Sequence, residues 1–311
     1  MTGTTSGTAN REPRRHHYVP RCWLAGFTDT GEKDGTLWVT DFKRKKQRDA
    51  NPASVGFIND FYRLSEPSPD PVVVEKFFAT LEEQVGPLLK SIDRERRRPT
   101  GGDLDVLLEF MAYQWVRVPR FRPFAFQVME RVTKEKLGEQ LRSEDTWLAT
   151  LKKTNTDPAR PGADYEGMKR FFESGEWNIT VETDWYMQRA FRDANGVLES
   201  LRKRHWGVSF TQKGRLIASD NPIVLEGDKG QMIGFKNAEF ILYPLSRHAF
   251  LTGVYDKTLK PIHNFNYFAS MNTMMMLNAD EQVFSHVPDF SWLDEHRKHQ
   301  TDWTLFSKVK Y

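Results

Sequence analysis

Two adjacent histidines, His16 and His17, lie near the beginning of the chain in the run RRHHYVPRCWLAGF (14–27). Imidazole groups bind metals and exchange protons near neutral pH, and the nearby Arg21 has the side chain best suited to hold an anionic group. Adjacent side chains on an extended backbone point to opposite faces. We therefore expect one histidine to face a site and the other to make a supporting contact.

The histidine pair resembles the adjacent histidines of metal-dependent nucleases of the His-metal-finger type. In those enzymes one histidine faces the metal and the other acts as a general base. The asparagine and histidine that complete their motif on a helix are not evident in this sequence. The alternative is that both rings are hydrogen-bonding residues that fix an N-terminal strand.

A second candidate group lies in the run QWVRVPRFR (114–122), where Gln114 and Arg117 fall on one side of a mostly apolar helix. Polar groups in such a helix need partners, because burial without hydrogen bonds is costly. Arg117 and the following Arg120 could bind a phosphate or carboxylate at two points. The alternative is an internal salt bridge from Arg117 to Glu82 or Glu83.

The third group is Asp220 and Asn221 in ASDNPIV (218–224), where a strand ends at a corner. Pro222 favours an extended conformation at Asn221. Asp220 could be a metal ligand or a general base at this strand end. The alternative is a turn built by the Asp and Asn side chains themselves.

The elements that must position these groups follow from the apolar pattern. Apolar residues at three- and four-residue spacing predict a helix over 72–94 and a second over 104–118, and short β-rich runs predict strands over 36–42 and 56–64. Further helices are expected over 124–141, 164–175, 182–204 and 264–280. The side chains expected in the core between the first two helices are Phe77, Phe78, Leu81, Leu88, Leu108, Met111 and Trp115.

This order of elements predicts an α+β fold with a helical middle region beside a mostly antiparallel sheet, to which the N-terminal strands could return. We expect a flexible N-terminal arm over residues 1–13, followed by a single domain over 14–311. Its helical part spans about 72–204 and its β-rich part about 205–290.

Composition excludes several classes of protein. Of the 311 residues, 39% are hydrophobic and 28% are charged, and no run is long enough to span a membrane. A single cysteine, Cys22, excludes an intramolecular disulfide, and no secretory signal is apparent, so a cytoplasmic location is the default expectation. The basic runs at 43–48 and 94–99 are candidates for a nucleic-acid or phosphate surface, or simply for a solvated loop or helix end.

Four stretches together identify a resemblance to a bacterial family of unknown function. These are HHYVPRCWLAGF (16–27), RVPRF (117–121), SDNP (219–222) and YPLS (243–246), and Asn272 corresponds to a late asparagine of that family. The resemblance spans nearly the whole chain and implies a set of residues rather than a reaction. Because these residues are mostly polar and widely separated in sequence, they suggest one pocket assembled from several elements.

The leading hypothesis is a metal-assisted hydrolase or nuclease that acts on a phosphodiester or another phosphorylated substrate. A divalent metal would be held by His17 and Asp220, and Asp220 beside an arginine would stay ionised while a nearby histidine held its proton more tightly. The residues expected to converge on the pocket are His16, His17, Arg117 and Asp220 as catalytic groups, with Arg21, Gln114, Arg120, Asn221 and Asn272 on the substrate.

Two alternatives belong to other classes. One is a non-catalytic module that binds nucleotide, nucleic acid or another protein. The other is a tailoring enzyme for an anionic small molecule. The sequence does not specify the oligomeric state, and it indicates no membrane partner.

Overall fold

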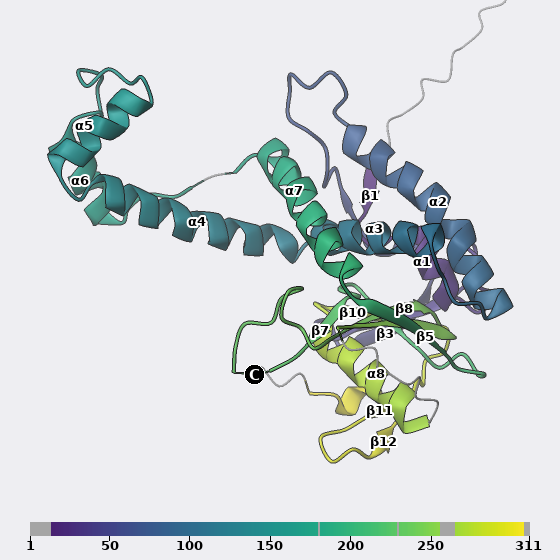
Figure 1. Cartoon of the computed structure of the whole chain (residues 1–311). Coiled ribbons are helices and arrows are strands. Elements are labelled where there is room, and N and C mark those ends of the chain that lie inside the picture. Colours follow the sequence, from purple (N-terminus) through teal and green to yellow (C-terminus); the bar gives the residue numbers. More distant parts are fainter. Residues whose placement is uncertain (1–13, 180, 229, 256–264, 308–311) are drawn as a thin grey trace, which may run out of the picture.

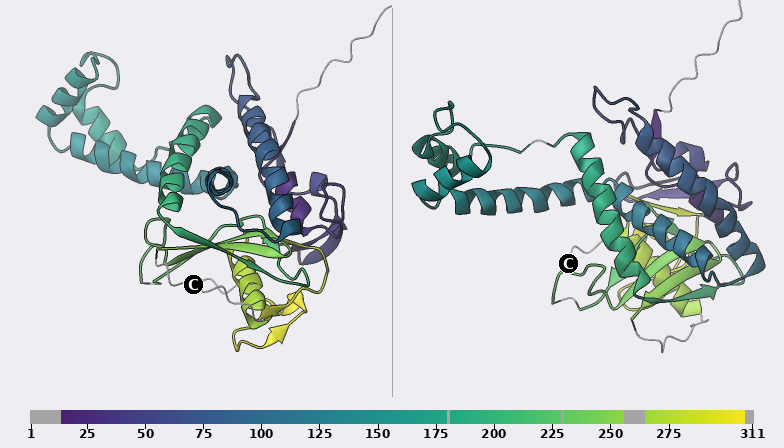
Figure 2. Two further views of the ribbon diagram at one scale, coloured as in Figure 1. Left: turned by 45° about the vertical axis from the view of Figure 1, so that its right-hand side comes forward. Right: turned by 45° about the horizontal axis from the view of Figure 1, so that its top comes forward.

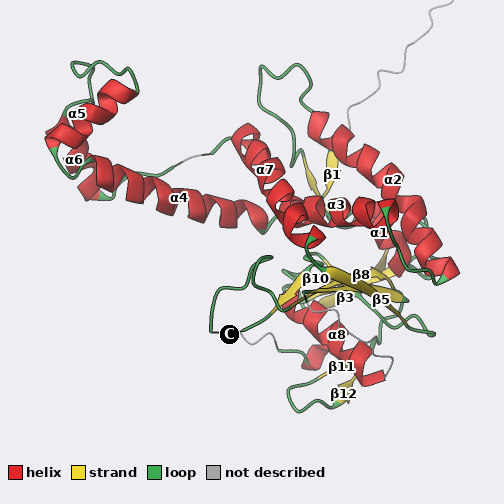
Figure 3. Cartoon of the chain, in the orientation of Figure 1, coloured by secondary structure: helices red, strands yellow, loops and turns green. Residues whose placement is uncertain are grey.

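The computed structural model describes residues 14–179, 181–228, 230–255 and 265–307. The expected N-terminal arm, residues 1–13, lies outside the described residues. Helices and antiparallel sheets make up the fold, which confirms the α+β class (Figure 3).

Most of the helices form where the sequence pattern predicts them. The bounds are α1 Arg21–Leu24, α2 Val73–Glu95, α3 Gly102–Arg117, α4 Phe121–Gln140, α5 Glu144–Lys153, α6 Tyr165–Ser174, α7 Thr183–Arg202 and α8 Phe265–Asn278. Helix α5 was not predicted from the sequence. It is short and begins with a capping box in which Ser143 and Thr146 satisfy each other's backbone N–H groups, a signal that the apolar pattern alone does not show.

The main sheet has the strand order β5-β9-β8-β7 and lies between two layers of helix. Its strands are β5 His205–Phe210, β7 Val224–Glu226, β8 Phe240–Ser246 and β9 Ala249–Val254. Side chains alternate along β8. Ile241 and Tyr243 pack with α2, α3 and α7 on one face, whereas Leu242 packs with α8 on the other (Figures 1 and 2). This double burial explains why β8 is mostly apolar from Phe240 to Leu245.

A second sheet has the order β3-β2-β10-β6, with β2 Leu37–Asp41, β3 Lys46–Ala50, β6 Ala218–Ser219 and β10 Gln282–Ser285. The N-terminal strand β2 therefore does return to pair with a late strand. The basic run 43–48 is a loop only in its first part, where residues 43–45 form a turn, and it continues into the edge strand β3 of this sheet. Lysines on an edge strand oppose pairing with other chains.

Two-stranded pairings complete the sheets, β1 Arg15–His17 with β4 Phe57–Asn59 and β11 Trp292–Leu293 with β12 His299–Gln300. The predicted strand over 56–64 is shorter than expected. It ends before Asp60, whose φ of 54° is incompatible with an extended strand.

Helices α4, α5 and α6 form a projection that leaves the body at residue 121 and carries α5 and α6 at its far end (Figures 1 and 2). This end has a small core of its own, made by Leu141, Trp147, Leu151 and Ala163. We call residues 121–174 the helical projection. No helix among the described residues is both long and apolar enough to cross a membrane.

The predicted core between α2 and α3 is largely confirmed. Phe78, Leu81, Leu88, Leu108 and Met111 are buried. Phe77 and Trp115 are only half-buried, which corrects the expectation for these two side chains.

We expect the change Leu81→Ala to lower the free energy of unfolding by about 2–5 kcal/mol, because it leaves a cavity between packed helices. Urea denaturation measures this loss. The matched control is Leu148→Ala on α5, where the leucine is 44% exposed. A loss for Leu81→Ala no larger than that of the control would show that this helix face is not a core.

Candidate functional site

The two histidines have divided roles, as expected for adjacent residues on strand β1. His16 is fully buried, its Nδ1 accepts a hydrogen bond from the backbone N–H of Tyr62 at 2.9 Å, and its ring stacks on the Tyr62 ring. His17 points to the other face and is half-buried. His16 is thus a supporting residue, and His17 is the histidine that remains for a site.

His17 is a neutral imidazole at physiological pH. Burial, together with the positive charges of Arg21 and Arg117, lowers the pKa of His17 to about 4. The expectation that a histidine of this pair holds its proton more tightly is therefore wrong for His17. The expectation assumed a neighbouring carboxylate, whereas the charges that act on the ring most strongly are cationic.

Arg117 ends α3 and is buried, with 1% of its surface exposed. Its Nη1 lies 3.0 Å from the Glu82 carboxylate on α2, and its Nη2 donates to the backbone carbonyl of His17. Its guanidinium carbon lies 4.2 Å from the centre of the Phe78 ring. The internal ion pair with Glu82, which the sequence offered as the alternative to substrate binding, is what the structure contains.

Glu75 belongs to the same charged group, and the sequence analysis missed it. Its Oε2 is buried without a hydrogen-bond partner, and burial raises the pKa of Glu75 to about 7 although Arg117 opposes that shift. Glu75 and Glu82 are seven residues apart on α2, so they lie on one side of the helix. Two carboxylates at this spacing beside the apolar stripe were the signal that could have revealed them.

Asp220 connects the end of strand β6 to the backbone of residues 280–282. Its carboxylate accepts hydrogen bonds from the backbone N–H groups of Asp280, Glu281 and Gln282 at 2.7, 2.8 and 2.9 Å. Burial raises the pKa of Asp220 to about 6, and no ion pair joins Asp220 to Arg117 among the described residues. The expectation that Asp220 pairs with an arginine is therefore wrong, although a carboxyl group with this pKa is still mostly ionised at neutral pH.

Asn221 is held by a reciprocal contact with helix α8. Its Nδ2 donates to the carbonyl of Asn278 at 3.0 Å, and Nδ2 of Asn278 donates back to the carbonyl of Asn221 at 2.6 Å. The SDNP segment, for which the sequence offered a turn as the alternative, is thus connected by hydrogen bonds to the end of α8.

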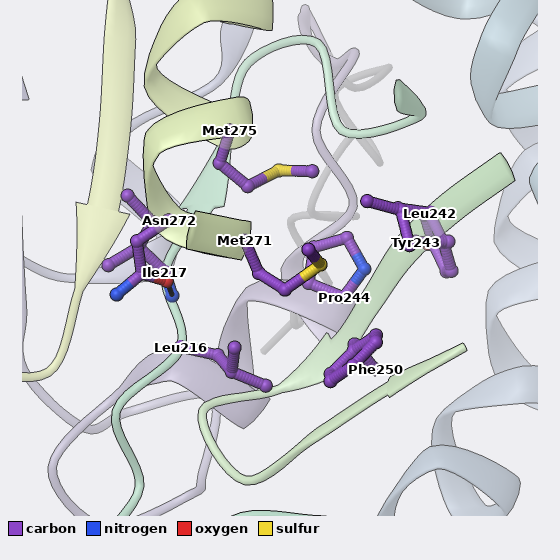
Figure 4. Close-up of a pocket in the computed structure, with 9 residues that line it drawn as sticks. All are labelled: Leu216, Ile217, Leu242, Tyr243, Pro244, Phe250, Met271, Asn272 and Met275. Atoms are coloured by element: carbon purple, nitrogen blue, oxygen red, sulfur yellow. Dashed lines mark hydrogen bonds between the residues drawn. The ribbon is translucent and has the colours of Figure 1, made fainter. Parts of the chain in front are cut away.

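Asn272 is buried within α8 and also serves backbone groups. Its Oδ1 accepts from the N–H of Ile217, and its Nδ2 donates to the carbonyls of Arg215 and Ser291. Figure 4 shows it beside the apolar side chains of Met271 and Met275, around a cavity of about 10 Å³. Such a cavity has room for one water molecule at most, so Asn272 does not face a substrate-sized space here.

Gln114 is fully buried in α3, and its Oε1 accepts a hydrogen bond from the hydroxyl of Tyr243 on the main sheet. Arg21, in contrast, is exposed at the start of α1. The free thiol of Cys22 in the same helix is buried, and burial raises its pKa, which favours an unreactive thiol.

The predicted pocket is therefore only partly assembled. His17 and Arg117 meet, but Asp220 lies with a different set of partners. Tyr18 follows His17 in the chain, and burial, together with the negative charge of Asp220, raises the pKa of its hydroxyl group. The described residues contain no group of three or more His, Cys, Asp or Glu side chains that could hold a metal ion. A metal shared by His17 and Asp220 has no support from this geometry.

Ser246, the last residue of the YPLS stretch and of β8, lies beside Asp93 of α2 and His248. Ser246 donates to the Asp93 carboxylate, which also lies 3.1 Å from Nδ1 of His248. In a nucleophilic triad the histidine contacts the serine hydroxyl. Here the hydroxyl oxygen instead accepts the N–H groups of His248 and Ala249 at 3.0 and 3.1 Å, so this cluster fixes a turn.

A cavity of about 540 Å³ lies at the root of the helical projection, beside two of the predicted residues, and we call it the α4 cavity. Asn221 and Arg120 both line it. One apolar wall, from the end of α3 and the start of α4, consists of Trp115, Val118, Phe121 and Phe124. The other wall includes Ile223, just before β7, Leu225 in β7, and Ile233 and Phe235 in the segment that follows β7.

Comparison with known proteins gives a family but no activity. Residues 15–289 match the model of a family that is described only as a protein of unknown function. No curated protein and no solved structure matches the chain.

We expect Asp220→Asn to lower the free energy of unfolding by about 1–3 kcal/mol, because an amide has one acceptor oxygen and would leave a buried N–H group unpaired. Chemical denaturation measures the loss. Asp157→Asn, an exposed aspartate that accepts one backbone N–H, is the control. Equal stability of the Asp220 variant and wild type would contradict the structural role of this carboxylate.

Glu75 should make stability depend on pH. Because its pKa is raised in the folded protein, the unfolded chain releases the proton first, and stability falls as pH rises from the ordinary carboxyl value of 4.5 to about 7. Glu75→Gln should remove this part of the fall, as measured by denaturation at a series of pH values. Glu83→Gln, an exposed change on the same helix, should retain it. Identical profiles for wild type and the Glu75 variant would refute the assignment.

Proposed function

We propose that this protein, a member of the DUF4238 family, binds a small molecule in its α4 cavity. The description of the family states no activity, so the proposal rests on the cavity of this chain. The observation that carries this proposal is the size and lining of that space. Ligand sites typically have volumes of about 300–1,000 Å³, apolar walls and a few polar groups that set orientation. The α4 cavity has these features, with Arg120, Asn221 and Lys236 among its polar residues.

The metal-assisted hydrolase or nuclease that the sequence suggested has weaker support. The carboxylate of Asp220 already accepts backbone N–H groups at both oxygens, and the guanidinium of Arg117 is engaged by Glu82 and by the His17 carbonyl. Arg120 and Asn221, two of the residues expected to contact substrate, do line the α4 cavity. These contacts favour the binding function, or a reaction on a bound small molecule, over phosphodiester hydrolysis at Asp220.

The proposal predicts that N-phenyl-1-naphthylamine, an uncharged fluorescent probe, binds the full chain at one saturable site. The change Leu225→Trp fills the cavity from the β7 side and should abolish that binding. Leu148→Trp places the same new side chain on an exposed site of α5 and should leave binding unchanged. Fluorescence titration measures both.

Hydrogen exchange locates the bound probe independently of the titration. Hydrogen exchange of the backbone amides at residues 124–128, at the start of α4, should slow when the probe is bound, because the ligand packs against Phe121 and Phe124. The proposal fails if neither this probe nor its sulfonate analogue, 8-anilino-1-naphthalenesulfonate, binds, or if the Leu225→Trp variant binds as well as wild type.

A further inference from the structure

The charged residues that line the α4 cavity all have the same sign. They are Arg120, at the start of α4, and Lys236, in the segment that faces it, and no carboxylate is among the lining side chains. Charges of one sign in a cleft with apolar walls create a focused potential that attracts the opposite charge. An uncharged ligand would gain no attraction from this positive potential, and a cationic ligand would be repelled by it.

Arg120 retains hydrogen-bonding capacity for a ligand. Its side chain is 58% exposed, and its Nη1 lies 3.5 Å from the Asp280 carboxylate. Strong charge-assisted hydrogen bonds between such groups are about 2.7–2.9 Å long, so the pair is loose. A guanidinium has five N–H donors, and most of those of Arg120 are therefore available.

Lys236, which also lines the α4 cavity, is exposed. No ion pair of its ammonium group is found among the described residues, in contrast to Lys43, Lys76 and Lys90, which have acidic partners. An anionic group placed between Arg120 and Lys236 would give both cations a partner.

We propose that the ligand of the α4 cavity is an amphipathic anion, with an apolar body between the two walls and one carboxylate, phosphate or sulfonate group held by Arg120 with the help of Lys236. This inference rests on the proposed function and adds the chemical class of the ligand. The guanidinium plane suits two-point binding of such a group. The aromatic side chains of Trp115, Phe121 and Phe124 supply the surface for the apolar body.

Two matched fluorescent probes test the charge requirement. 8-Anilino-1-naphthalenesulfonate carries a sulfonate on the same ring system that N-phenyl-1-naphthylamine presents without charge. We expect Arg120→Gln to weaken binding of the sulfonate by about tenfold, the loss typical of a hydrogen bond to a charged group. Binding of the uncharged probe should not change. Arg131→Gln, an exposed arginine further along α4, is the control and should change neither affinity.

A second variant and a set of competitors identify the anion. Lys236→Gln should weaken the sulfonate in the same direction as Arg120→Gln. Decanoate and decyl phosphate are tested as competitors that displace the bound sulfonate probe, and 1-decanol is the uncharged control. Either anion should compete better than the alcohol. The stronger of the two anions indicates whether the ligand group is a carboxylate or a phosphate. Competition by the alcohol that equals that of both anions would overturn the inference.

The failures of the two proposals are distinguishable. If the uncharged probe binds at the cavity but Arg120→Gln leaves the sulfonate's affinity unchanged, or weakens both probes equally, the cavity binds small molecules but not through an anionic group. If neither probe binds, the proposed function itself is wrong.

Discussion

A buried guanidinium constrains how the first half of the molecule assembles. Removing a charge from water is expensive unless it is paired and hydrogen-bonded, and Arg117 has almost no exposed surface. Its charge is balanced by Glu82 on α2, and its remaining contacts include the carbonyl of His17 on β1. Helix α2, helix α3 and the N-terminal strand must therefore meet at one point. The same contact explains why a histidine-rich strand near the beginning of the chain packs against helices some hundred residues later.

The second half of the molecule is held by neutral and acidic side chains that bind backbone groups. Asp220, Asn221 and Asn272 connect strand β6 and its flanks to the middle of α8, to its C-terminal end and to the segment that follows it. Buried backbone N–H and carbonyl groups at chain corners need partners where no sheet or helix supplies them. The polar residues of SDNP thus satisfy backbone groups that a corner would otherwise leave unpaired. Their presence in a motif reflects this requirement as well as any contact with a ligand.

Sequence periodicity was sufficient for α2, which buries one continuous stripe, and it also located α3, which is buried around most of its circumference. It failed for α5, whose stability depends on the Ser143 cap, and for β3, whose basic side chains conceal an edge strand. The divided roles of His16 and His17 followed from strand geometry alone. The pairing of Arg117 with Asp220 that the sequence predicted is not found, because complementary charges far apart in sequence have many candidate partners. Tertiary packing gave Arg117 the nearer Glu82 and gave Asp220 three backbone N–H groups.

The α4 cavity is connected to the buried ion pair by covalent structure. Arg117 is the last residue of α3, and Val118 and Arg120, which both line the cavity, follow within three positions. The intervening Pro119 has a restricted backbone, so fixing Arg117 also limits where Arg120 and the start of α4 can lie. The opposite wall is limited in the same way, because Asn221 lines the cavity and is tied to Asn278. Buried polar contacts of the motifs, such as those of Arg117 and Asn221, therefore fix the two walls of the α4 cavity, which Arg120 and Asn221 line. In the function that we propose, these walls would hold the ligand.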